Sequence, residues 1–140
     1  MPARLFIVTP AAANARNGNR HTAARWTRML RSDGFRAGVA RSWQGEPCDA
    51  LIALHARRSH ASIAAFRNTG KPIVVVLTGT DLYKDLPASA EARESLVLAD
   101  RVIVLQDAAL RELEPAVRRK ARRCAHPPSA VPRSAANERT

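Results

Sequence analysis

The sequence predicts an α/β fold in which helices cover both faces of a parallel β-sheet. The clearest segment is residues 73–77, an unbroken apolar run rich in β-branched side chains that follows Lys71 and Pro72. A short apolar run with such boundaries is typical of a strand buried on both faces. Similar runs alternate along the chain with segments of helical periodicity, which indicates a doubly wound, Rossmann-like sheet with right-handed crossovers. We expect residues 73–77 to form its central strand.

The other strands are shorter or weaker versions of the same pattern. The second candidate is interrupted by Arg36 and Gly38, so we place it toward an edge of the sheet. The third candidate is apolar through its middle. In chain order the expected strands are residues 4–8, 35–40, 49–55, 73–77 and 101–105.

The first helix is marked by an apolar stripe and a stop signal. Arg25, Arg28 and Arg31 are expected to face water. Gly34 follows the segment as the residue that ends the helix. The stripe consists of Ala23, Trp26, Met29 and Leu30.

The later helices are predicted mainly from residues that favour helix ends. Ser59 is expected to be the N-cap of the second helix, and residues 87–89 lead into the third. Asp107 is expected to cap a last helix. Pro115 breaks or restarts that helix before residues 117–121.

Composition indicates a single globular domain. The chain has 140 residues, of which 46% are hydrophobic and 25% charged, and its longest apolar run is too short to span a bilayer. The apolar region at the N-terminus is too short for a secretory signal. We therefore expect a soluble cytoplasmic protein without a membrane partner, in which Cys48 and Cys124 stay reduced. Neither cysteine has metal-ligand spacing.

The net charge of +11 raises the question of a nucleic-acid partner. Residues 111–140 hold eight basic and three acidic residues, so +5 of this charge lies in the final segment of the chain. Aromatic residues make up only 4%, which leaves few platforms for stacking bases. The sequence also lacks helix-turn-helix, zinc-finger and RNP patterns. These observations argue against nucleic-acid binding.

Three groups of polar residues follow the first, third and fourth expected strands. Because the carboxyl ends of parallel strands share one edge of the sheet, where open α/β folds bind ligands, we expect the groups to converge. Helix N-termini with arginine and histidine beside them suit phosphate or a related oxyanion. The candidate anion-binding residues are Gly18, Asn19, Arg20, His21, His55, Arg57, Arg58, Thr78, Gly79, Thr80 and Asp81.

Each group also has a purely structural interpretation. Gly18 is equally suited to a simple turn, since the sequence contains neither G-x-G-x-x-G nor a Walker lysine. His55 fits a hydrogen-bonded core histidine as well as a functional one. Arg57 and Arg58 fit a solvated loop, and Asp81 fits a cap of the turn that follows it. Both interpretations stay open at this point.

Five stretches carry a longer pattern. They read GNRHTAARW (residues 18–26), ALHARRS (53–59), LTGTDLY (77–83), ADR (99–101) and LQ (105–106). In this order they resemble the N-terminal half of the selenosugar synthase family. These enzymes are glycosyltransferases of GT-B type, similar to the group that includes sucrose and glycogen synthases. The resemblance covers residues 4 to about 122.

The resemblance implies a specific reaction. A member of this family would transfer N-acetylglucosamine, or a related sugar, from a UDP-sugar to selenophosphate, forming a carbon–selenium bond in selenoneine biosynthesis. In GT-B enzymes the N-terminal domain largely holds the acceptor, whereas the C-terminal domain holds the nucleotide sugar. Neither a metal nor another cofactor is implied.

The resemblance also implies roles for individual residues. Arginine and histidine side chains would hold the selenophosphate anion, two glycines would let the backbone approach it, and two polar residues would orient a sugar hydroxyl or the acceptor. The residues that would hold the anion are Arg20, His21, Arg57 and Arg58. The two glycines are Gly18 and Gly79, and the two polar residues are Thr80 and Asp81.

The sequence departs from this family after Arg122, where a proline-containing segment replaces the expected strand. We expect the C-terminal donor domain of this family to be missing. We therefore expect an enzyme fragment that is inactive alone or is completed by a separate donor-domain chain. A shifted reading frame or a truncated gene would produce the change in sequence after Arg122. The alternative is a stand-alone Rossmann-like module that binds an anion or a nucleotide without catalysis.

Residues 123–140 contain three prolines and lack apolar periodicity, so burial would not offset the entropy lost by ordering them. We expect brief protease treatment to remove this segment and leave a folded core over residues 1–122, as measured by mass spectrometry of the product. Equal protection of the Ala130 and Val75 amides in hydrogen exchange would contradict this prediction.

Overall fold

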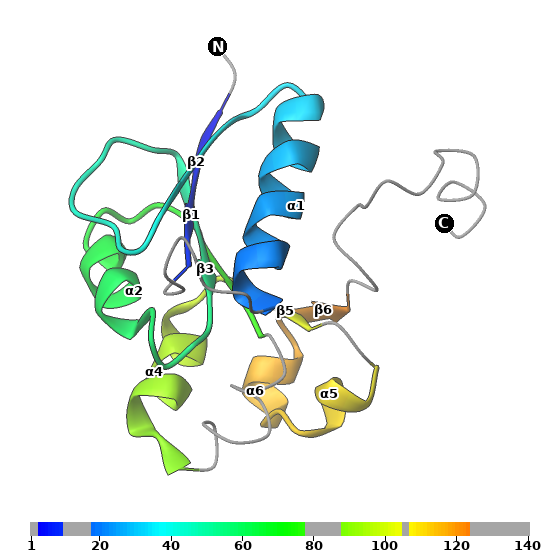
Figure 1. The fold of residues 1–140 in the computed structure, drawn as a ribbon. Coiled ribbons are helices and arrows are strands. Elements are labelled where there is room, and N and C mark those ends of the chain that lie inside the picture. The colour runs from blue at the N-terminus through cyan, green and yellow to red at the C-terminus, as the bar shows by residue number, and fades with distance from the viewer. Residues whose placement is uncertain (1–2, 10–17, 78–87, 105–106, 124–140) are drawn as a thin grey trace.

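The computed structural model describes residues 3–9, 18–77, 88–104 and 107–123. They form an α/β fold whose single sheet has six strands in the order β2-β1-β3-β4-β5-β6, with every neighbouring pair parallel (Figure 1). This Rossmann-like arrangement confirms the predicted fold class. The strands are β1 (Arg4–Val8), β2 (Arg36–Ala40), β3 (Ala50–Leu54), β4 (Ile73–Val76), β5 (Arg101–Val104) and β6 (Ala121–Arg123).

The strand order places one topological switch point between β1 and β3. The chain passes from β1 to β2 on one side, then returns to the other side of β1 to form β3, and proceeds outward from there. Ligands of doubly wound sheets bind at such a switch point, outside the carboxyl ends of the strands. β4 lies beside β3 in the middle of the sheet, as its apolar sequence predicts.

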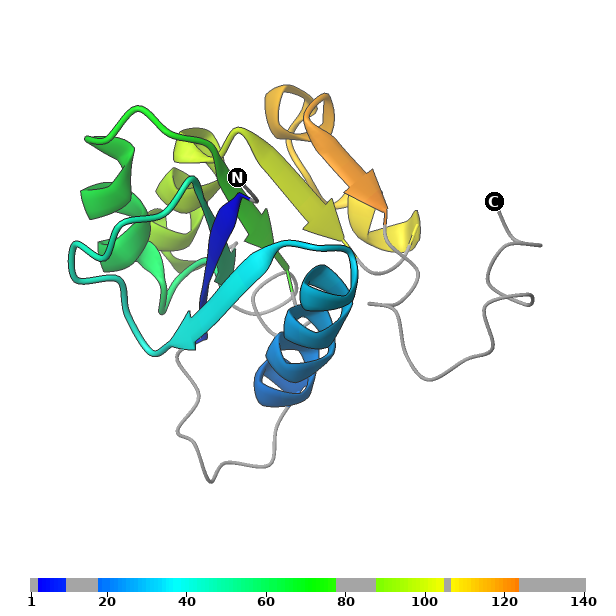
Figure 2. The same ribbon diagram turned by 90° about the horizontal axis from the view of Figure 1, so that it is seen from above.

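Helices lie on both faces of the sheet (Figure 2). α1 (Gly18–Ser32) covers one face, where Ala23, Trp26 and Leu30 join a core cluster that contains Ile7 and Leu54. The opposite face is covered by α2 (His60–Arg67), α4 (Ala90–Leu98), α5 (Asp107–Arg111) and α6 (Pro115–Arg118). Of the helices in the described residues, none is long and apolar enough to cross a membrane.

The connection from β2 to β3 crosses the sheet without a helix in residues 41–49. Trp43 anchors it, because its ring packs edge-to-face on Phe66 of α2 with the ring centroids 5.0 Å apart. The Trp43 backbone N–H also donates a hydrogen bond to the Ser62 hydroxyl at 3.0 Å. These contacts explain how an aromatic loop covers apolar surface that a helix covers elsewhere.

Gly34 ends α1 as predicted. Its φ of 93° lies in the left-handed region, where a side chain would be strained. The Gly34 N–H donates to the Arg31 carbonyl at 3.1 Å, and the Phe35 N–H donates to the Leu30 carbonyl at 3.0 Å. This pair of bonds is a Schellman motif, which satisfies carbonyls at the helix end.

The C-terminal part of the fold differs from the sequence prediction. Of the two outcomes expected at Pro115, a break or a restart, the structure has the restart, because α6 begins at Pro115. The expected extension to residue 121 was wrong, because α6 ends at Arg118 and Ala121 begins β6. β6 pairs in parallel with β5, and the Val102 N–H donates to the Lys120 carbonyl at 3.1 Å. β6 has three residues, two of them arginines, and no apolar run, so its sequence does not indicate a strand. Only its pairing with β5 shows that it is one.

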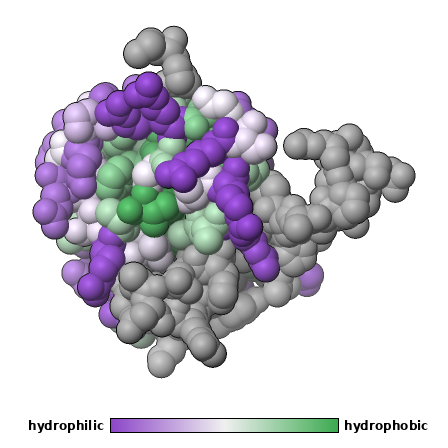
Figure 3. All heavy atoms as spheres, turned by 45° about the horizontal axis from the view of Figure 1, so that its top comes forward, coloured by the Kyte–Doolittle hydropathy of each residue, from purple (hydrophilic) through white to green (hydrophobic). Residues whose placement is uncertain are grey.

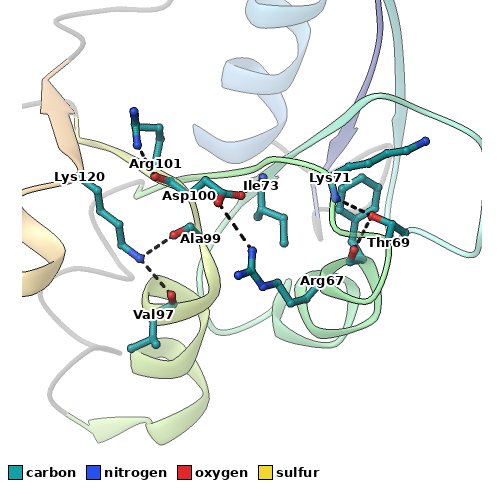
Figure 4. A network of polar contacts seen from close by, with 10 residues as sticks. Arg67, Thr69, Lys71, Ile73, Val97, Ala99, Asp100, Arg101 and Lys120 are labelled. Atoms are coloured by element: carbon teal, nitrogen blue, oxygen red, sulfur yellow. Dashed lines mark hydrogen bonds and ion pairs between the residues drawn. The ribbon is translucent and has the colours of Figure 1, made fainter.

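Two aspartates fix the amino edge of the sheet in the same way. The Asp49 carboxylate accepts a hydrogen bond from the Arg4 backbone N–H at 2.7 Å, while the Asp49 N–H donates to the Arg4 carbonyl. The Asp100 carboxylate accepts from the Ile73 N–H at 2.8 Å, and the Asp100 N–H donates to the Ile73 carbonyl (Figure 4). Each aspartate thus satisfies the first backbone groups of the strand beside its own.

Lys120 adds a second connection at this edge. Its ammonium group donates to the carbonyls of Val97 at 3.0 Å and Ala99 at 2.6 Å, so it joins the start of β6 to the end of α4 (Figure 4). Burial lowers the pKa of Lys120, and the nearby Asp100 carboxylate opposes that shift.

On the face of the molecule that Figure 3 shows, hydrophilic side chains surround a small apolar area.

We predict that Asp100→Ala lowers the free energy of unfolding by about 1.5 kcal/mol, because the Ile73 N–H loses a charged acceptor. Asp100→Asn should cost less, since the amide retains an acceptor oxygen. Urea denaturation measures both changes. Arg67→Ala is the matched control, because the Arg67–Asp100 ion pair is 3.7 Å long and exposed. If Arg67→Ala costs as much as Asp100→Ala, the ion pair and not the backbone contact stabilises this edge.

Candidate functional site

The loop that follows β3 is built around a buried histidine. His55 is only 5% exposed, and its φ of 75° places it in the left-handed region that histidine tolerates better than most residues. The Arg58 backbone N–H donates to His55 Nδ1 at 3.2 Å. Because Nδ1 is an acceptor, the proton of the neutral imidazole belongs on Nε2. His55 is therefore a core residue that also lies at the carboxyl edge of the sheet.

Two serine hydroxyls hold this loop in place. The Ser59 hydroxyl donates to the Leu54 carbonyl at 2.6 Å, and the Ser95 hydroxyl of α4 donates to the Ala56 carbonyl at 2.6 Å. Ser59 occupies the N-cap position of α2 as predicted, but its side chain makes no capping bond. The hydroxyl binds the end of β3 instead. The loop is thus tied to β3 and to α4.

The arginines and the second histidine of this segment have different surroundings. Arg57 and Arg58 are exposed, so the loop presents two positive charges at its surface. His60, in the first turn of α2, lies with Nε2 2.5 Å from a Glu94 carboxylate oxygen and Nδ1 3.7 Å from one of Glu91. His60 therefore joins α2 to α4.

The first candidate group begins α1. Gly18, Asn19, Arg20 and His21 form the first turn of this 15-residue helix, as the sequence predicts for a helix start. The structure describes their helical backbone and not their side chains. The first N–H groups of an α-helix have no intrahelical partner and carry the positive end of its dipole. Because α1 returns from β1 to the start of β2, this turn lies at the carboxyl edge.

The third group, Thr78, Gly79, Thr80 and Asp81, lies outside the described residues. Leu77 is the last described residue before it, and its N–H donates to the Ile103 carbonyl at 2.9 Å. That bond extends the pairing of β4 with β5 by one residue. The roles predicted for the third group stay predictions.

Thr9 is a polar residue of this edge that the sequence analysis missed. It directly follows β1, is 6% exposed, and its hydroxyl has no hydrogen-bond partner in the described part of the chain. The Thr9 N–H donates to the Ala40 carbonyl at 2.9 Å, which continues the pairing of β1 with β2. The sequence did contain a sign of this residue, because Thr9 is a hydroxyl residue between an apolar strand and Pro10.

The carboxyl edge thus collects the N-termini of α1 and α2, two exposed arginines, a buried histidine and a buried threonine hydroxyl. The exposed arginines and the first turn of α1 carry positive charge, so the edge suits an oxyanion. At α2, the first N–H groups already donate within the loop, and the carboxylates of Glu91 and Glu94 contact His60. Within the described ranges, no three His, Cys, Asp or Glu side chains are grouped as a metal site would require.

Cys48 does not belong to this edge. It precedes β3, at the amino end of the sheet, and is a buried free thiol. Burial raises the pKa of the Cys48 thiol, which disfavours the thiolate form, and the nearby Lys71 opposes that shift. Cys124 lies outside the described residues.

Comparison of the chain with models of protein families and with curated proteins found no match. The chain therefore stands as an α/β domain with a six-stranded parallel sheet and no identified family.

Proposed function

We propose that this domain is the acceptor-binding half of a GT-B glycosyltransferase that resembles selenosugar synthase. The observation that supports it is the position of two motif-bearing segments, the first turn of α1 and the loop after β3, at the carboxyl ends of β1 and β3. These strands flank the topological switch point, where doubly wound folds bind ligands. Selenophosphate is a small tetrahedral anion that fits such a site.

In the proposed reaction, a selenium lone pair of selenophosphate attacks the anomeric carbon of the UDP-sugar. The carbon–selenium bond forms as the carbon–oxygen bond to UDP breaks, and UDP leaves with that electron pair. This domain would hold the acceptor through Arg20, His21, Arg57 and Arg58, and a separate donor-domain chain would hold UDP. Oriented hydrogen bonds and positive charge would supply positioning and not acid–base chemistry.

The second candidate is a stand-alone module of Rossmann-like type that binds an anion or nucleotide. The strand order favours it, because sheets with β2, β1 and β3 as neighbours also include proteins that bind a phosphate-bearing ligand at this switch point without a partner domain. Turnover of UDP-sugar and selenophosphate, measured with and without a donor-domain chain, distinguishes the two candidates.

We predict that inorganic phosphate, as a stand-in for selenophosphate, stabilises the domain by about 2.7 kcal/mol at a concentration of 100 times its dissociation constant. Arg20→Ala should remove most of the resulting shift in melting temperature, because it removes the cation beside the helix N-terminus. Differential scanning fluorimetry measures the shift.

The matched control is Arg28→Ala, which removes an exposed positive charge from the same helix. Arg31 is unsuitable, although sequence reasoning places it in solvent, because its guanidinium donates twice to the Ala37 carbonyl, at 2.7 and 3.2 Å. Equal losses in Arg20→Ala and Arg28→Ala would mean that phosphate is attracted diffusely to a chain of charge +11.

We also predict that this chain alone binds UDP-sugars weakly or not at all, because the proposal assigns the ribose and diphosphate contacts to a different domain. Isothermal titration calorimetry with UDP measures this directly. A micromolar dissociation constant would contradict the GT-B proposal and favour the stand-alone nucleotide module.

A further inference from the structure

Two buried polar atoms in the described residues lack a hydrogen-bond partner, Thr9 Oγ1 and Trp26 Nε1. Other buried hydroxyls are satisfied, such as Thr27, which donates to the Ala23 carbonyl at 2.7 Å. Leaving a buried polar group unpaired is unfavourable, so native folds rarely do it without a reason. A ligand that supplies the missing partner is one such reason.

The side chain of Thr9 lies on the α1 face of the sheet. Side chains alternate along a strand, and the Thr9 N–H continues the β1–β2 pairing one residue beyond Val8. Val8 belongs to the core cluster on the α2 and α4 face, whereas Ile7 belongs to the cluster under α1. Thr9 therefore follows Ile7, on the face and at the edge where α1 begins.

Thr9 also stands beside the switch point. β1 pairs with β3 as far as Val8 and Ala53, so Thr9 follows the last paired residue between these strands. Trp26 occupies a different place, eight residues into α1 or about 12 Å from its first residue, among the apolar side chains of the same cluster. Of the two orphaned atoms, Thr9 Oγ1 is the one at the ligand-binding edge.

We propose that the Thr9 hydroxyl donates a hydrogen bond to an oxygen of an oxyanion bound at the N-terminus of α1. This inference rests on the anion site of the proposed function and adds to it a neutral donor from β1. A helix N-terminus favours a negatively charged ligand, and toward such a ligand a hydroxyl at the same edge of the sheet acts as a donor. Burial of Thr9 excludes water from this bond and makes the donor specific to a ligand that reaches the strand end.

The decisive variant is Thr9→Val, which removes the hydroxyl and keeps the shape of the side chain. We expect its melting temperature without ligand to equal or exceed that of the wild type, because an unpaired buried hydroxyl is lost. The affinity for inorganic phosphate, measured by calorimetry, should fall at least about tenfold, the effect of one hydrogen bond to a charged group. Thr9→Ser should retain most of the affinity.

Thr27→Val is the matched control, because it removes a buried hydroxyl whose partner is a carbonyl within α1. Its affinity for phosphate should match that of the wild type. UDP is the second probe, and a tenfold loss seen with UDP but not with phosphate would identify a nucleotide diphosphate as the ligand oxyanion.

Different results overturn different parts of the account. If Thr9→Val binds both probes like the wild type while Arg20→Ala does not bind phosphate, the Thr9 inference fails and the proposed site survives. If neither variant changes binding, both fail. A large fall in the melting temperature of Thr9→Val without ligand would also overturn the inference, since the hydroxyl would then have a structural partner.

Discussion

β1 pairs in parallel with β2 on one side and β3 on the other, and this double pairing determines where the functional groups lie. Parallel neighbours require crossovers that return the chain to the same edge, so α1 and α2 both begin at the carboxyl ends of strands. Because β2 and β3 lie on opposite sides of β1, α1 and α2 begin on opposite faces of the sheet. The amino ends of both helices therefore lie at the carboxyl edge of the sheet.

The two edges of the sheet are stabilised by different chemistry. At the amino edge, Asp49 and Asp100 satisfy backbone groups of neighbouring strands, and Lys120 joins β6 to α4. At the carboxyl edge, the hydroxyls of Ser59 and Ser95 hold the backbone of the loop after β3. Neutral hydroxyls therefore fix the loop itself, and carboxylates enter only at the first turn of α2, where Glu91 and Glu94 contact His60.

Sequence reasoning succeeded where a local pattern and the tertiary structure agree. The apolar run of β4 and the Gly34 stop of α1 are such cases, because burial on both faces and a left-handed residue leave direct marks in the sequence. β6 was missed because only its pairing with β5 makes it a strand.

The candidate site was predictable to a smaller extent. Its placement at the helix starts follows from the alternation of strands and helices, which the sequence shows. The actual partner of Ser59 was not predictable, because an N-cap serine has two acceptable uses for its hydroxyl and tertiary context chooses between them. Thr9 was overlooked because a single threonine after an apolar run is typical of a strand end, and its burial depends on tertiary contacts that the sequence does not show.

We infer that an oxyanion binds at the carboxyl edge beside the switch point. Nitrogen–proton correlation spectra recorded during a phosphate titration test it most directly, because they report every backbone amide separately. We expect saturable shifts concentrated at Thr9, residues 18–20 and residues 58–59, with the Asp49 and Asp100 amides unchanged. Shifts of equal size at both edges, or shifts that follow exposed arginines over the whole surface, would contradict it.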